Sequence, residues 1–124
     1  MSAFAADVAA LLRKARTVTI ETSAGGEAPV HRTIIWIVAD ESGRAFVRSV
    51  RGRRGRWYRE LAANPSGAVF AGGRRIAVRA APADEAGIEA CSRLLRDKHA
   101  TARASLASML RDEILDTTLE LEPA

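Results

Sequence analysis

Short alternating segments separated by turn residues constrain this chain more than any other feature. Residues 17–22 alternate between apolar and polar side chains, and residues 33–39, 45–50, 67–71, 75–81 and 117–122 are further strand-like segments. Turn signals join neighbouring segments directly at residues 24–29, at residues 40–43 and at Gly72-Gly73. Strands joined by hairpins pair antiparallel, whereas parallel strands need crossover helices. The pattern therefore predicts an antiparallel sheet of six strands.

Helical spacing predicts four helices around this sheet. An amphipathic helix opens the chain over residues 4–15, and a short helix over residues 57–63 ends at Asn64-Pro65. Asp84 is positioned to cap a third helix, and a fourth carries the apolar residues from Leu106 to Ile114. The run at 33–39 is apolar on both faces, which is typical of a central strand. We expect one α+β, mainly β domain over residues 1–124, built as a small closed or half-closed barrel.

Composition excludes several classes of protein. The hydrophobic content of 48% is too high for a disordered chain, and no apolar run has the length of a membrane span. A single cysteine excludes an internal disulfide, and the N-terminus has no secretory pattern, so we expect a cytoplasmic protein. The two histidines and the cysteine have no metal-site spacing, so we expect no metal; we expect Cys91 in the core and both histidines at the surface or behind a site.

A cluster of arginines is the strongest functional signal. Six fall between positions 48 and 59, in a segment that follows a strand and precedes a helix. Gly52 and Gly55 permit close approach of the backbone to a ligand, and a helix start offers N–H groups to an anion. Guanidinium groups pair with phosphate or carboxylate through two hydrogen bonds. The segment therefore predicts a phosphate-binding site, with a solvated basic loop as the alternative.

The run from position 31 to position 69 resembles the deazaflavin-dependent nitroreductase branch of the split β-barrel flavin and deazaflavin oxidoreductases. The ordered motifs that carry the resemblance are Arg32-Thr33, Ser49, Arg51-Gly52, Trp57-Tyr58, Leu61 and Asn64-Pro65. The C-terminal half departs from the nitroreductases and is more similar to a small uncharacterised branch. Ile34 stands where the nitroreductases have a proline, from which we expect this strand to pair fully.

The resemblance implies a six-stranded antiparallel split barrel of the FMN-binding type, commonly a homodimer, with an N-terminal helix, a short helix after the third strand and one or two helices before the last strand. It implies FMN or the 8-hydroxy-5-deazaflavin coenzyme as cofactor, and the charged deazaflavin tail suits an arginine-rich groove better. By position, the residues implied in cofactor binding are Arg32, Thr33, Ser49, Arg51, Gly52, Arg53, Arg54, Gly55, Trp57 and Tyr58.

The implied reaction is hydride transfer between the reduced cofactor and a small quinone, nitro or enone acceptor. Such chemistry belongs to the cofactor, so no strong general base is needed; Tyr58 is a candidate proton donor. Two alternatives stay open: a non-catalytic binder of a flavin-type or other flat anionic ligand, and a nucleic-acid-binding module. Sparse aromatic residues, 5% of the chain, disfavour nucleic acid.

Overall fold

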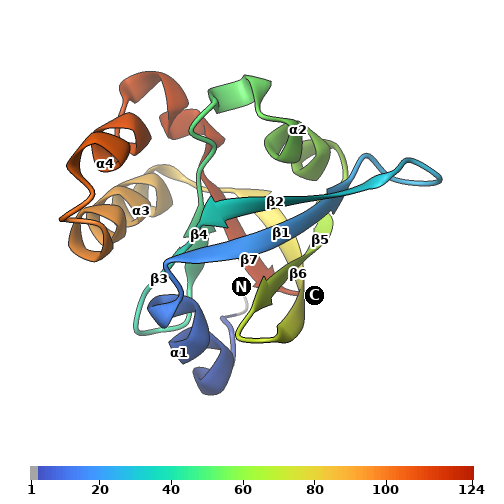
Figure 1. Cartoon of the computed structure of the whole chain (residues 1–124), viewed down its shortest axis with the longest axis horizontal. Coiled ribbons are helices and arrows are strands. Elements are labelled where there is room, and N and C mark those ends of the chain that lie inside the picture. Colours follow the sequence, from blue (N-terminus) through green and yellow to red (C-terminus); the bar gives the residue numbers. More distant parts are fainter. Residues whose placement is uncertain (1–2) are drawn as a thin grey trace.

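The computed structural model describes residues 3–124 as a curled antiparallel sheet with helices at its ends and along one side (Figure 1). No helix in this part of the chain is both long and apolar enough to cross a bilayer. The elements, in chain order, are α1 (Ala6–Lys14), β1 (Thr17–Ser23), β2 (Val30–Trp36), β3 (Val38–Ala39), β4 (Ala45–Val47), the 3-10 helix η1 (Gly52–Arg54), α2 (Arg56–Ala63), β5 (Ser66–Ala71), β6 (Arg74–Pro82), α3 (Glu85–Lys98), α4 (Arg103–Met109), the 3-10 helix η2 (Asp112–Thr117) and β7 (Leu119–Pro123).

The sheet has seven strands in the order β2-β1-β5-β6-β7-β4-β3, and all its pairs are antiparallel. The predicted antiparallel half-barrel is confirmed, but the predicted number of six strands is wrong. The run expected as one central strand is divided at Ile37 into β2 and β3, which form the two edges of the sheet. β2 pairs with β1 over its whole length, Ile34 included, and its other side is a free edge of the sheet.

Residues 33–39 are apolar for a reason other than the predicted one, which was burial of a central strand between two neighbouring strands. Ile35 and Ile37 point into the barrel, whereas Val38 packs against α3 and α4 on the opposite side. Ile34, in contrast, is 73% exposed on the outer face of β2. The run is therefore apolar because its side chains lie in three different places: the barrel interior, the contact with the helices, and the exposed face of the edge strand.

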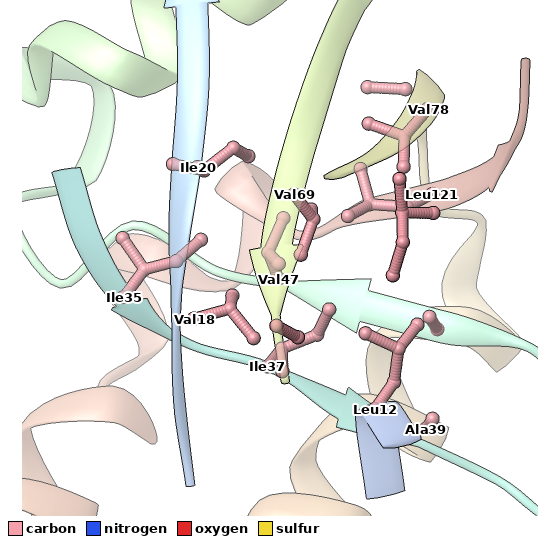
Figure 2. Close-up of a cluster of buried hydrophobic side chains, with 14 of the residues drawn as sticks. Leu12, Val18, Ile20, Ile35, Ile37, Ala39, Val47, Val69, Val78 and Leu121 are labelled. Carbon is pink, nitrogen blue, oxygen red and sulfur yellow. The ribbon is translucent and has the colours of Figure 1, made fainter. Parts of the chain in front are cut away.

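Two clusters of buried side chains hold the fold together. The larger one fills the barrel and is closed by α1 at one end and α2 at the other (Figure 1). Figure 2 shows its centre, where side chains from β1, β2, β4, β5, β6 and β7 converge with Leu12 of α1. The smaller cluster lies between the β3–β4 hairpin and helices α3 and α4, and contains Val38, Phe46, Cys91, Leu95, Met109 and Ile114.

Local signals in the second half of the chain give mixed outcomes. Gly72 and Gly73 adopt positive φ angles of 55° and 76°, as the predicted tight hairpin requires. The Asp84 side chain accepts a hydrogen bond from the Gly87 N–H at 2.8 Å, which confirms the predicted cap of α3. The fourth helix was predicted too long, because α4 ends at Met109 and Ile114 lies in η2.

The cysteine and the two histidines can be compared with their predicted positions. Cys91 is buried in the second cluster as predicted, and burial raises the pKa of its thiol to about 11. His31 is half-buried and its Nδ1 lies 2.8 Å from Oε2 of Glu60. His99 is fully buried and stacks on Trp36, so it is not at the surface, the first of the two positions expected for it.

Candidate functional site

A cavity of about 440 Å³ opens between the free edge of β2, the end of β4 and helix α4. In Figure 1 the β4–α2 connection and α4 lie on the same side of the sheet as this edge. The volume falls in the usual range for small-molecule sites, about 300–1,000 Å³. The residues that line the cavity are Thr17, Thr33, Ile34, Ile35, Trp36, Arg48, Ser49, Val50, Arg51, Trp57, Ser105, Ser108 and Met109.

All charged side chains of the cavity lining are positive. Its only ionisable side chains are Arg48 and Arg51, and no acidic residue is among its members. Arg51 is exposed to solvent, whereas Arg48 is 2% exposed. Because a cavity wall of low polarity strengthens the field of each charge, the pocket favours a ligand that is negatively charged.

Arg48, the residue after β4, holds the C-terminal helices against the barrel. Its guanidinium donates hydrogen bonds to Oγ1 of Thr118 at 2.8 Å and to Oγ of Ser92 at 3.0 Å. It also donates to the carbonyl oxygens of Met109 and Ile88, each at 3.0 Å. Burial lowers the pKa of this guanidinium, although an arginine stays protonated at physiological pH.

A second arginine, Arg111, also connects α4 to the segment that follows β4. Nε of Arg111 donates to the Ser108 carbonyl oxygen at 2.9 Å, and its Nη2 donates to the carbonyl oxygen of Val50. Arg48 therefore links β4 to the last residue of α4, and Arg111 links the end of α4 to the loop after β4. These bonds fix the position of Ser105, Ser108 and Met109, which form one wall of the cavity.

Contacts within the protein explain why glycine stands at positions 52 and 55 of the basic loop. The Ser49 hydroxyl donates to the Gly52 carbonyl oxygen at 2.8 Å, and a Cβ atom at Gly55 would lie 2.5 Å from Ser49 Oγ. Gly52 has a φ angle of +65°, and a Cβ atom there would lie 3.3 Å from Cγ2 of Ile114. The glycines therefore let the loop fold onto itself and onto η2.

Of the residues implied by the resemblance, four line the cavity: Thr33, Ser49, Arg51 and Trp57. The others have different surroundings. Arg32 is on the outer face of β2, where its Nη2 lies 3.1 Å from Oε1 of Glu21. Arg53 forms an ion pair with Asp116, and Arg54 is exposed without lining the cavity.

Tyr58, the candidate proton donor, lies next to the cavity wall without forming part of it. Its ring packs edge-on against Trp57, with the ring centroids 6.4 Å apart. It also packs against the barrel core. The Tyr58 side chain therefore lies behind Trp57, and Trp57 is the residue that lines the cavity.

Sequence reasoning did not find two parts of the site. Arg48 belongs to the arginine cluster, but its burial carries no local signal because arginine is seldom buried. Ser105, Ser108 and Met109 lie in a helix whose spacing predicts only a packed face. Their place at the cavity follows from the docking of α4 against β4, which is a tertiary contact.

Comparisons with known proteins give a family and a fold. Residues 9–121 match the model of DUF2255, a family described as uncharacterized proteins conserved in bacteria. The chain belongs to this family. No curated protein matches it. No group of three or more His, Cys, Asp or Glu side chains within residues 3–124 is arranged to hold a metal ion.

Solved structures share this fold with low sequence identity. An F420-H2 dependent reductase, FDR-A, has 16% identity and a TM-score of 0.66 over 86% of this chain and 94% of its own. A putative pyridoxamine 5'-phosphate oxidase from Listeria innocua has 14% identity and a TM-score of 0.62 over 95% and 90%. The heme storage protein HutZ from Vibrio cholerae has 12% identity and a TM-score of 0.63 over 95% and 88%. The fold is therefore found in named oxidoreductases and in a storage protein alike.

Proposed function

We propose that this member of the family binds a flavin-type cofactor in the cavity and acts as a reductase of split-barrel type. The cofactor is the 8-hydroxy-5-deazaflavin coenzyme or FMN, with preference for the former. The observation that carries the proposal is an apolar cavity whose only charged side chains are two arginines. A flat apolar ring with an anionic tail is the ligand that such a lining fits. The fold of FDR-A and of the Listeria innocua protein supports this reading.

The residues present fit such a group. Trp36 offers apolar aromatic surface to a ring beside the largely buried Trp57, and Arg51 offers a solvated guanidinium to a phosphate or carboxylate at the cavity mouth. The bound cofactor would supply hydride transfer to a small quinone, nitro or enone acceptor. The protein would position the two molecules and exclude water, with the Ser105 and Ser108 hydroxyls on the acceptor side.

A non-catalytic binder is the alternative, since HutZ shares the fold and is named as a heme storage protein. The two functions differ in turnover. Purified protein loaded with the reduced cofactor should oxidise it when a quinone or nitro acceptor is added. Binding without turnover of any acceptor would leave the binder as the better description.

A nucleic-acid-binding function has less support from the geometry. Single-strand binders use exposed aromatic rings as stacking surfaces beside basic residues. Here Trp57 is 7% exposed and Tyr58 is packed against it, so the basic segment presents arginines without an open ring. RNA binding at micromolar concentration together with no binding of either cofactor would reverse this preference.

Arg51→Ala is expected to weaken cofactor binding by about 1–3 kcal/mol, which is about 5- to 150-fold in Kd, because it removes a charged hydrogen bond to the tail. Titration of the protein with FMN and with the deazaflavin coenzyme, followed by absorbance or fluorescence, measures the change. Arg59→Ala is the matched control, since Arg59 is exposed on α2 and does not line the cavity. Equal losses in both variants would mean that the arginines act only through the net charge.

The cavity mouth also has the character of a contact surface, and we infer that the chain forms a homodimer there. Three large hydrophobic side chains are exposed within residues 3–124: Val30 at 59%, Ile34 at 73% and Val50 at 45%. Ile34 and Val50 both line the cavity. A second copy that covers them would remove apolar surface from water and shield the site from solvent.

Light scattering after size-exclusion chromatography is expected to give the mass of a dimer for the native chain and of a monomer for Ile34→Lys. The charged side chain would be placed in an apolar contact without a partner. Ala62→Lys, at an exposed position of α2, is the control and should remain dimeric. A native chain that stays monomeric at high micromolar concentration would contradict this assignment.

A further inference from the structure

Arg48 is a buried cation without an acidic partner. Of the five N–H donors of its guanidinium, four are hydrogen-bonded, and every acceptor is neutral: two hydroxyls and two backbone carbonyls. None of the ion pairs within residues 3–124 includes this side chain. Arginine with 2% exposure is normally paired with a carboxylate, because an uncompensated charge is costly to bury.

The protein compensates this charge in part. Met109 is the last residue of α4, so its carbonyl oxygen lies at the negative end of the helix dipole. A helix end corresponds to roughly half an elementary charge at most, which leaves a net positive charge at Arg48. Arg48 is also one of the residues that line the cavity, and the other ionisable residue of the lining is an arginine as well.

The guanidinium is held in a fixed orientation from three sides. Ile88 and Ser92 belong to α3, Met109 to α4, and Thr118 precedes β7. Its position needs no ordering when a ligand arrives, whereas Arg51 is exposed and must lose rotamer freedom on binding. A preorganised cation in a low-polarity wall is the stronger anion receptor of the two.

We propose that Arg48 binds an oxyanion, phosphate or carboxylate, of the ligand in this cavity and thereby sets its preference for anionic over neutral ligands of the same ring. This inference rests on the proposed function, because it concerns the same cavity. It differs from the expectation drawn from the resemblance, in which Arg32, Thr33, Ser49 and the basic loop from Arg51 onward hold the phosphate or its neighbours and Arg48 has no part. Arg53 is already engaged by Asp116 on the outside of that loop.

The experiment compares ligands that share a ring and differ in whether they carry the anionic tail. FMN is paired with riboflavin, and the deazaflavin coenzyme with its neutral core that lacks the phosphate-bearing tail. We expect Arg48→Met to weaken the charged member of at least one pair by 10-fold or more and its neutral member by less than about 3-fold, as loss of one charged hydrogen bond predicts. Arg48→Lys keeps the charge and should restore part of the preference.

Arg59→Met, outside the cavity, is the matched control, and Arg51→Met, which removes the other arginine of the lining, is measured for comparison. Equal losses for charged and neutral ligands in Arg48→Met would overturn the proposal and leave Arg48 with a purely structural role. A charge-dependent loss seen only in Arg51→Met would overturn it too. Where Arg48→Met does not fold, Arg48→Lys decides: an unchanged ratio of charged to neutral affinity contradicts the proposal, because lysine cannot reproduce the fork of a guanidinium.

Failure of the proposed function has a separate signature. If the native protein binds no member of either pair, inorganic phosphate and pyrophosphate replace the flavins, and the readout becomes the shift in melting temperature. A shift in the native chain that disappears in Arg48→Met supports the oxyanion site without a flavin. No shift in the native chain at millimolar phosphate or pyrophosphate overturns it.

Discussion

Ile37→Ala is expected to lower the free energy of unfolding by about 2–5 kcal/mol, the usual cost of truncating a fully buried isoleucine. Ile37 is 0% exposed and lies in the barrel core between β2 and β3, where Figure 2 shows it beside Val18 and Val47. Removing three carbon atoms leaves a cavity that close-packed neighbours fill only in part. Chemical denaturation followed by tryptophan fluorescence measures the loss.

Ile34→Ala is the matched control, because both isoleucines belong to the same apolar run of the sequence. Ile34 is 73% exposed, so its truncation should change the free energy of unfolding by no more than about 0.5 kcal/mol. The comparison is made at a protein concentration at which both variants are monomeric. Similar losses at both positions would mean that the run is buried on both faces, as a central strand would be.

Ile34 and Ile37 also show which features of the fold could not be predicted from the sequence. Alternation and turn residues predicted the antiparallel hairpins, and the Gly72-Gly73 turn and the Asp84 cap are local signals that the structure confirms. The division of residues 33–39 into two edge strands is a matter of tertiary pairing. An apolar side chain has the same identity whether a strand, a helix or a second molecule covers it, so periodicity cannot distinguish these three.

The site was predictable to a similar extent. The coincidence of glycine, arginine and a helix start located the loop after β4, and four residues of the cavity lining in total follow from the resemblance. The glycines of that loop, however, are accounted for by contacts with Ser49 and Ile114. The wall formed by α4 and the burial of Arg48 depend on how the C-terminal helices dock, for which the sequence holds no local signal.

The stability of the chain is expected to fall by about 2 kcal/mol between pH 8 and pH 5 because of His99 alone. Burial, and to a smaller degree the neighbouring cations Lys98 and Arg16, lower the pKa of this imidazole to about 4. Neither ring nitrogen has a hydrogen-bond partner within residues 3–124. In the unfolded chain the pKa is near 6.5, so between these values the unfolded state binds more protons. Stability from this residue is therefore complete above about pH 6.5 and is lost as the pH falls toward 4.

His99→Phe should remove this dependence while keeping a ring against Trp36, whose indole is stacked on the imidazole at a centroid distance of 3.7 Å. Phenylalanine has no polar nitrogens to bury, so the variant is expected to be as stable as the native chain at pH 8 or more stable. Denaturation curves at pH 8 and pH 5 for both proteins isolate the effect, because the two proteins differ at position 99 alone. Parallel pH profiles would show that His99 is solvated or hydrogen-bonded in the folded protein.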